Sequence, residues 1–397
     1  MAPAPPHTLC FDAYTLDLMR CTLVRGGHEI RLRPKTFDTL RYLAEHAGRV
    51  VSKEELLRAV WPSVVVTDDS VVQCIREIRD ALLDDTHQIV KTVPRRGYLF
   101  VAELSTMRPG NQIPDIRVRD QKVSFCRTID GVNIAVARVG HGAPIVCTPT
   151  WATHLEHDWA NPARAGLWHF LADRFELIRY DGRGFGLSDR NVSEISFATF
   201  ERDLEAVVDA LALPRYALLG ISQGCAAAIA HAARYPERVS RMIVHGGFAL
   251  GRNKCGYAKE IELSKAFITI MREGWGDDDS ALLRIFSSSW LPGASPDQIK
   301  RYSNLLRSST TLENAIRNRL AADEIDITDF LSQVRRPTLV LHCRSDNSVP
   351  FREGRRLGTS IANAILVSLE SENHVPLPNE PVWPRFVDAI STFLSVP

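Results

Sequence analysis

The sequence predicts two domains: a small α+β domain, then a larger α/β domain with a mostly parallel sheet. A chain of 397 residues is long for one domain. The first hundred residues hold short strands, helical periodicity and a basic hairpin, whereas strands and helices alternate from Val123 onward. Between the two, residues 105–122 contain Pro109, Gly110 and Pro114 and show no periodicity, as expected of a linker.

The composition excludes several classes of protein. Hydrophobic residues make up 45% of the chain and charged residues 24%, as in ordinary globular proteins. The net charge of +1 gives no bulk attraction to nucleic acid or membrane, so DNA binding would need a local basic patch. The eight cysteines are scattered, and no secretory signal or membrane span is evident. The scattered cysteines therefore predict reduced thiols in a cytoplasmic protein. We expect no metal site and no cofactor.

The smaller domain is expected over residues 11–104, after a Pro/Ala-rich start at 1–10 that we expect to be disordered. Short alternating runs over 11–32 predict small antiparallel strands. Apolar residues at helical spacing, with a capping box at Ser52, then predict three helices, and a hairpin with a basic turn follows. These elements cover residues 34–46, 52–62, 69–83 and 89–101.

Three helices and a basic hairpin are the parts of a winged helix-turn-helix domain. The segment resembles the OmpR/PhoB-type winged-helix DNA-binding domain over nearly its full length. The residues that carry this resemblance are Leu32–Leu40, Val51–Leu56, Trp61-Pro62, Val71–Leu82 and Ile89–Tyr98. The resemblance implies a platform of β-strands at the start of the domain. It also implies that Asp69–Leu83 is a recognition helix that enters the major groove of double-stranded DNA.

The same resemblance implies which side chains meet the DNA. Those that would face the groove are Ser70, Gln73, Cys74 and Arg76. Those that would serve the DNA backbone or the wing are Arg79, Lys91, Thr92, Arg95, Arg96 and Tyr98. The residue types agree, because Arg and Gln can read base edges while Lys and Arg neutralise phosphates. Two alternatives stay open: single arginines as solvated surface charges, and the whole segment as a protein-binding winged helix.

A second motif organises the larger domain. An apolar run ends at Leu219, the sequence Gly220–Gly224 follows, and an Ala-rich stretch continues to Ala233. This is G-x-S-x-G between a predicted strand and a predicted helix, a setting that lifts the serine hydroxyl clear of the sheet. The two glycines leave room for the neighbouring backbone. The amide of Gln223 would then point to where an oxyanion forms.

Two more candidates follow buried strands downstream. Asp346 lies just past the apolar run 337–342, and His374 follows the run 364–369. Ligand-binding groups gather at the carboxyl ends of parallel strands, so Ser222, Asp346 and His374 are expected together there. In a triad, His374 would take the Ser222 proton and Asp346 would orient the imidazole. Each of the three alone fits an ordinary turn or loop residue equally well.

The larger domain, residues 123–397, resembles the α/β-hydrolase family. The residues that carry this resemblance are Asp181–Asp189, Gly220–Gly224, Tyr235–Val239 and Asn373–Pro376. The resemblance implies the α/β-hydrolase fold with a helical lid, which the insertion at about 250–334 would supply. The family commonly has His-Gly where this chain has Cys147–Trp151. The second oxyanion amide would therefore come from Trp151 or Thr150.

Several apolar residues of the insertion have two interpretations. They could line a pocket for a small, fairly apolar ligand, or they could form the core of the lid itself. These residues are Phe267, Met271, Phe286, Trp290 and Leu291. The Trp151 side chain is open to a third, simpler interpretation, which is core packing.

Together these patterns predict a one-component DNA-binding transcription regulator. Its α/β-hydrolase-like domain would bind a small ester, lactone or aromatic ligand, and whether it also hydrolyses that ligand stays open. Two alternatives remain: an active serine esterase or lactonase with an accessory DNA-binding domain, and a protein-interaction module. The expected partners are double-stranded DNA, a small-molecule ligand and a second copy in a homodimer, with no membrane. The chain shows no receiver-like half, so phosphorelay control is not indicated.

Overall fold

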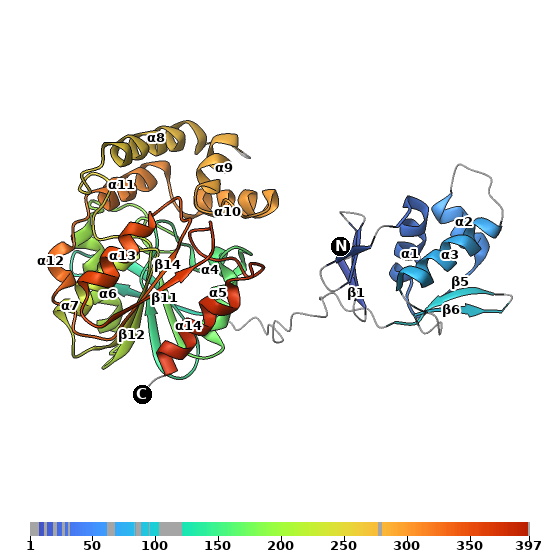
Figure 1. The fold of residues 1–397 in the computed structure, drawn as a ribbon, viewed down its shortest axis with the longest axis horizontal. Helices are drawn as coiled ribbons and strands as arrows, with labels where there is room; N and C mark the ends of the chain where they lie inside the picture. The colour runs from blue at the N-terminus through green and yellow to red at the C-terminus, as the bar shows by residue number, and fades with distance from the viewer. Residues whose placement is uncertain are drawn as a thin grey trace. The chain divides into compact units, whose positions relative to one another are not determined.

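The chain divides into two compact units (Figure 1), residues 1–117 and 118–397. Each unit has its own hydrophobic core. The computed structural model describes residues 8–11, 14–18, 22–25, 28–30, 32–61, 68–82, 84, 89–94, 96–102, 121–276 and 280–395. Within these ranges no helix is both long and apolar enough to cross a bilayer.

The smaller unit is a winged helix, as the sequence predicts. It opens with a four-stranded antiparallel sheet of β1 (Thr8–Phe11), β2 (Tyr14–Asp17), β3 (Thr22–Arg25) and β4 (His28–Ile30). Three helices follow, α1 (Pro34–Glu45), α2 (Lys53–Val60) and α3 (Asp68–Leu82). A second sheet has the order β5-β7-β6 and consists of β5 (Val50–Val51), β6 (Val90–Val93) and β7 (Gly97–Phe100).

Local sequence features explain the start of α2 and the pairing of the wing hairpin with β5. The hydroxyl of Ser52 caps α2 by accepting a hydrogen bond from the Glu55 amide at 3.1 Å. Gly97 has a φ of +133°, and a Cβ there would lie 2.0 Å from the Val51 carbonyl oxygen. Only glycine therefore lets β7 pair with β5 at this point. The wing hairpin is in this way fixed to the helical core.

The larger unit is built on an eight-stranded sheet with the order β15-β14-β13-β12-β10-β11-β9-β8. Along this order, neighbouring strands from β15 to β11, β10 included, are parallel. Strand β9 runs antiparallel to both β8 and β11. The strands are β8 (Lys122–Arg127), β9 (Asn133–Gly140), β10 (Pro144–Cys147), β11 (Glu176–Tyr180), β12 (Tyr216–Ile221), β13 (Val239–His245), β14 (Thr338–Cys343) and β15 (Ala364–Leu369).

Helices cover both faces of this sheet (Figure 1). One core forms beneath α6 (Phe197–Ala210), α7 (Gly224–Arg234), α12 (Thr328–Leu331) and α13 (Phe351–Ser360). The other forms beneath α5 (Ala165–Ala172) and α14 (Trp383–Ser395). The short helix α4 (Leu155–Ala160) precedes α5. The lid has its own apolar cluster and consists of α8 (Ala258–Gly274), α9 (Ala281–Ser288), α10 (Pro296–Ser309) and α11 (Leu312–Asp323).

A buried ion pair ties the glycine-rich turn after β11 to helix α6. Arg183 exposes 1% of its side chain and donates to Asp203 at 2.7 Å and to Asp130 at 2.7 Å. Replacing Asp203 by alanine leaves the buried guanidinium with Asp130 alone, whose side chain is 29% exposed. We expect the variant to lose about 3–5 kcal/mol of unfolding free energy in urea titrations of the full chain.

The matched control lies on the same helix. Asp209 pairs with Arg238 at 2.7 Å, but its side chain is 65% exposed. Asp209→Ala should therefore cost only about 0–1 kcal/mol. Equal losses in the two variants would show that burial of the Arg183 pair contributes nothing beyond an ordinary surface contact.

Candidate active site and nucleic-acid surface

Ser222 occupies a strained turn between β12 and α7. Its φ is +55°, in the left-handed region that residues with a Cβ rarely adopt. The flanking glycines make the turn sterically feasible: a Cβ on Gly220 would lie 2.6 Å from Cys225 Cα, and one on Gly224 2.6 Å from the Pro149 carbonyl oxygen. The Ser222 amide donates to the His245 carbonyl at 2.9 Å. This is the geometry of a nucleophile elbow.

Asp346 and His374 meet in the loops after β14 and β15. One oxygen of Asp346 accepts from the amides of Ser348 at 2.8 Å and Val349 at 3.1 Å. The other lies 2.7 Å from His374 Nδ1. Burial would raise the pKa of Asp346, but the charge of His374 and its hydrogen bond outweigh burial and lower it. The carboxylate thus holds the proton on Nδ1 and leaves Nε2 of His374 as the basic nitrogen.

Ser222 and the ring of His374 are not hydrogen-bonded to each other. Nε2 of His374 is buried and has no hydrogen-bond partner among the described residues. Ser222 and His374 line two neighbouring cavities that share Trp290. Catalytic hydrogen bonds are often long in unliganded sites and shorten when substrate binds. The three predicted residues therefore lie at one edge of the sheet, with only the Asp–His half of the relay formed.

The lid is attached directly to the histidine loop. The His374 amide donates to the Trp290 carbonyl at 2.8 Å, and the two rings lie perpendicular at 4.9 Å. The Gly293 amide donates to the side chain of Asn373, the residue before the histidine, at 2.9 Å. The segment after α9 thus helps to position His374. Sequence spacing gave no sign of this contact.

The two residues predicted to supply oxyanion amides, Gln223 and Trp151, lie close to Ser222. Gln223 is the N-cap residue of α7, and the first amides of a helix have no partner within it. The Thr148 hydroxyl donates to the Gly224 carbonyl at 2.8 Å and so holds the loop after β10 against the elbow. Trp151, further along that loop, lines the same cavity as Ser222 and Gln223. Both predicted oxyanion residues therefore border the serine.

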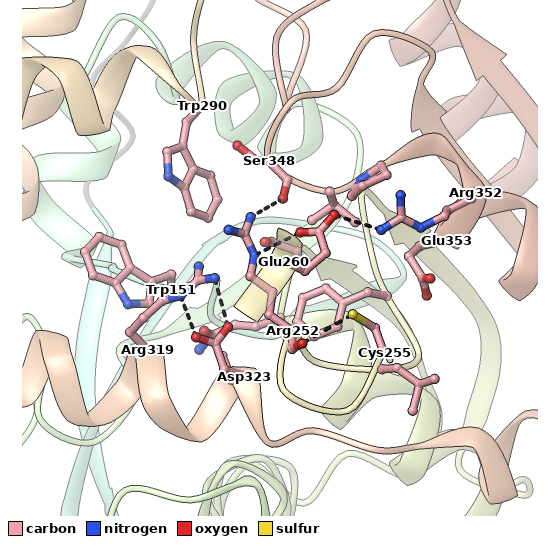
Figure 2. A pocket seen from close by; sticks show the side chains of 17 residues that line it. Trp151, Arg252, Cys255, Glu260, Trp290, Arg319, Asp323, Ser348, Arg352 and Glu353 are labelled. Carbon is pink, nitrogen blue, oxygen red and sulfur yellow. Dashed lines mark hydrogen bonds and ion pairs between the residues drawn. The ribbon is translucent and has the colours of Figure 1, made fainter. Parts of the chain in front are cut away.

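The cavity beside Ser222 holds about 570 Å³ of space, its mouth included, which lies in the range of small-molecule sites. Figure 2 shows Trp151 and Trp290 on one side and several charged side chains across from them. The labelled charged residues of its wall are Arg252, Glu260, Arg319, Asp323, Arg352 and Glu353. These charged side chains stand beside apolar ones such as Phe248, Leu250 and Val349, so the wall is mixed in character.

The apolar lid residues divide between the two roles that the sequence left open. Phe267, Met271 and Phe286 belong to the buried lid core and do not line this cavity or the one beside His374. Trp290 lines both of those cavities, and Leu291 lines the second. The Trp151 ring packs 5.2 Å from Phe286 and also borders the cavity, so it serves core and site together.

On the winged helix, several predicted DNA contacts lie at the surface. Gln73 and Arg76 on α3 are exposed, and Ser70 is half-buried. On the hairpin Lys91, Thr92 and Arg96 are exposed. Arg95 lies outside the described residues. The exposed residues offer both base-reading and phosphate-binding side chains.

One predicted contact, Cys74 in the groove, needs correction, and two others, Arg79 and Tyr98, help to build the wing hairpin. Cys74 and Tyr98 are each 5% exposed and belong to the interior. The sulfur of Cys74 faces α1, where it accepts from the Thr36 hydroxyl at 3.8 Å, so it cannot reach a groove. Arg79 donates to the Val90 carbonyl at 2.7 Å and to the Thr92 hydroxyl at 2.8 Å. Its guanidinium therefore fastens the wing to α3 instead of pointing outward.

Known proteins match each half of the chain. AB hydrolase superfamily protein YisY of Bacillus subtilis is 26% identical over 63% of this chain and 91% of its own length. Transcriptional activator CadC of Escherichia coli is 40% identical over 77 residues, 19% of this chain and 15% of its own length. A solved esterase structure from Exiguobacterium antarcticum superposes with a TM-score of 0.59 at 22% identity, covering 69% of this chain and all of that one. The structural likeness supports the fold.

Two family matches account for most of the described chain. Residues 27–100 match the family described as transcriptional regulatory protein, C terminal. Residues 143–381, more than half of the chain, match the family described as alpha/beta hydrolase fold. The strand order, the lid and the elbow agree with the second match. The chain therefore belongs to the α/β-hydrolase fold family and carries an OmpR/PhoB-type DNA-binding domain ahead of its hydrolase domain.

Proposed function

We propose that this protein is a one-component transcription regulator that senses a small ester, lactone or aromatic compound. One observation carries the proposal: a DNA-binding domain is joined, in one chain, to a cavity of ligand size lined in part by lid residues. The exposed side chains of α3 and the hairpin would bind double-stranded DNA, and a DNA-binding role agrees with an expected location in the cytoplasm. A second copy would supply the other half of a two-fold DNA site.

Regulation requires that the ligand bind two states of the protein with different affinity. The lid offers a route, because the segment after α9 is bonded both to the His374 loop and, through the Ser289 carbonyl, to the Ser348 hydroxyl at 2.9 Å. A ligand that displaces Trp290 would move both loops together. Such a shift would change how the protein is arranged on DNA.

Hydrolysis is the second function that the site supports. The elbow at Ser222 and the 2.7 Å contact of Asp346 with His374 favour it. His374 Nε2 would take the serine proton while Oγ attacks the carbonyl carbon, and the amides of Gln223 and Trp151 would bind the oxyanion. His374 would then protonate the leaving group, and water would release the acyl product. Slow hydrolysis of the bound ligand would end the signal that the ligand gives.

Coupling between the two domains is tested with the full chain. DNA fragments are first selected for binding, and an ester and lactone library is screened by thermal shift. We expect at least one compound that stabilises the protein to change its affinity for the selected DNA by about 5-fold or more, measured by fluorescence anisotropy. The variant Arg96→Ala should keep the thermal shift while binding DNA more weakly. Compounds that stabilise the protein but leave DNA affinity unchanged would contradict a sensor role.

A further inference from the structure

One cation in the cavity beside Ser222 has fewer partners than its chemistry demands. Arg252 follows β13, and its side chain is 11% exposed. Its Nη2 donates to the Ser348 carbonyl at 2.7 Å, while Nε lies 3.8 Å from Glu260, too far for a hydrogen bond. Its Nη1 is buried and has no hydrogen-bond partner among the described residues. A guanidinium has five N–H donors, so most of these are unused.

The acidic residues around the cavity already have partners of their own. Asp323 accepts two hydrogen bonds from Arg319, at 2.8 and 3.2 Å, and another from the Ser264 hydroxyl. Glu260 accepts from Arg352 at 2.8 Å. Glu353 accepts from the Ala249 amide at 3.3 Å, and its other oxygen lies 3.6 Å from Arg356. Oε1 of Glu353 has no hydrogen bond, and Glu260 reaches Arg252 only as an ion pair at 3.8 Å, so none of these carboxylates bonds to the free Nη1.

The buried position of Arg252 makes its missing hydrogen bond energetically unfavourable. Figure 2 shows its guanidinium between Ser348 and Glu260, with Trp290 and the guanidinium of Arg319 on its other side. Burial, followed by the charge of Arg319, lowers the pKa of Arg252 to about 10. A buried donor without a partner is unfavourable, and more so when it is charged. The charges of Asp323 and Glu260 offset part of the repulsion by Arg319. An anion entering the cavity would supply the hydrogen bond that Nη1 lacks.

We propose that Arg252 binds a carboxylate of the ligand, so that the ligand is an ester or lactone whose acyl part carries a free carboxylate. A carboxylate fits because its planar pair of oxygens matches the guanidinium fork. This assignment rests on the proposed function, since it takes Ser222 as the reacting residue. Arg252 is then a specificity-determining residue of the acyl side.

The residues that line the two cavities indicate which part of the ligand carries the carboxylate. The cavity with Arg252 also contains Ser222, Gln223 and Trp151, which would surround the acyl carbon and its oxyanion. The cavity beside His374 holds about 560 Å³ and has a largely apolar wall. Its apolar residues include Leu167, Trp168, Leu291, Val375 and Trp383. Since His374 protonates the leaving group, the apolar cavity takes the alcohol part.

The reaction balances on this assignment. Ser222 Oγ forms a bond to the acyl carbon and the ester C–O bond breaks, while the serine proton passes through His374 to the leaving oxygen. Water then splits the acyl-enzyme and regenerates the serine. An ester gives an alcohol and a dicarboxylate, whereas a lactone gives a single hydroxy-dicarboxylate. The second carboxylate of that product would lie against Arg252.

The test compares pairs of esters that differ only in this charge. The mono-4-nitrophenyl esters of glutaric, adipic and pimelic acid are matched with the valerate, hexanoate and heptanoate esters, in which a methyl replaces the carboxylate. We expect the wild-type kcat/KM to favour at least one carboxylate ester by about 10-fold or more, the effect of one charge-assisted hydrogen bond. Arg252→Gln should abolish this preference, and Arg252→Lys should restore part of it.

A matched control is Arg344→Gln. Arg344 pairs with Glu370 at 2.7 Å, is 53% exposed and does not line either cavity, so its variant should keep the wild-type preference. A neutral ester preferred at every chain length would overturn the role of Arg252. A preference that survives Arg252→Gln would overturn it as well. Thermal melting of each variant checks that the protein is folded.

A binding measurement tests the carboxylate site independently of hydrolysis. Ser222→Ala protein is titrated with mono-4-nitrophenyl adipate by calorimetry, with and without Arg252→Gln. If no ester is hydrolysed but binding weakens about 10-fold in the double variant, hydrolysis fails and the carboxylate site stands. If both esters of each pair are hydrolysed equally, hydrolysis stands and the carboxylate site fails. If the protein neither hydrolyses the esters nor binds adipate monoester, both proposals are wrong.

Discussion

Replacing Ser222 by alanine is expected to reduce hydrolysis of 4-nitrophenyl esters by about 10³-fold or more, measured as kcat/KM of the purified full chain. Without Oγ there is no acyl-enzyme, and what remains is water attack in a site that still binds an oxyanion. The strained φ of +55° is tolerable for alanine to the same degree as for serine, so the loss should come from chemistry.

Ser360→Ala is the control for this experiment. Ser360 ends α13, is exposed and does not line either cavity, so its removal should leave hydrolysis unchanged. Both variants should melt near the wild-type temperature. If Ser222→Ala hydrolyses esters as fast as wild type, another group performs the chemistry and the elbow is only structural.

Loss of Arg76 or Arg96 is expected to weaken DNA binding in two different ways. Arg76→Ala removes an exposed side chain of the recognition helix and should cost about 1–3 kcal/mol on the selected sequence, but little on unrelated DNA. Arg96→Ala removes an exposed cation of the wing turn. It should weaken binding to all sequences and reduce the slope of log K against log salt by about 1.

The measurement is fluorescence anisotropy between 50 and 200 mM salt, the range over which phosphate contacts change affinity most visibly. Arg355, exposed on α13 of the other unit, provides an Arg→Ala control that should leave both quantities unchanged. Unaltered affinity and salt slope in both winged-helix variants would favour the protein-binding interpretation of this domain.

The parts that sequence predicted well depend on local rules. The elbow follows from two glycines around a serine, because no other residue fits next to Cys225 and Pro149. Asp346 and His374 follow apolar strand runs, and parallel strands bring their ends to one edge. The wing hairpin and the cap at Ser52 follow equally local signals.

Other features depend on tertiary packing and were missed. Helices α4, α5, α13 and α14 were not anticipated. The amphipathic face of α14, with Phe386, Ile390 and Phe393, becomes recognisable only against the sheet it covers. Arg252 and Arg319 come from distant segments and meet at the cavity through the lid, so no spacing in the sequence pairs them.

The misplacement of Cys74 has a simple cause. Resemblance placed Cys74 in the groove, yet the buried positions of α3 include Val71, Ile75 and Ile78, which face the core. Cys74 lies next to that stripe and turns toward α1. Helical periodicity would have corrected the resemblance at this position.

The proposal that Ser222 is a working nucleophile in the ligand cavity has one direct test. The full chain is treated with a fluorophosphonate, which phosphonylates activated serines, and the modified residue is located by mass spectrometry. We expect one adduct per chain on Ser222, absent in Ser222→Ala and formed far more slowly in His374→Ala. A folded protein that takes up no label, or takes it up at another residue, would contradict the serine-hydrolase site.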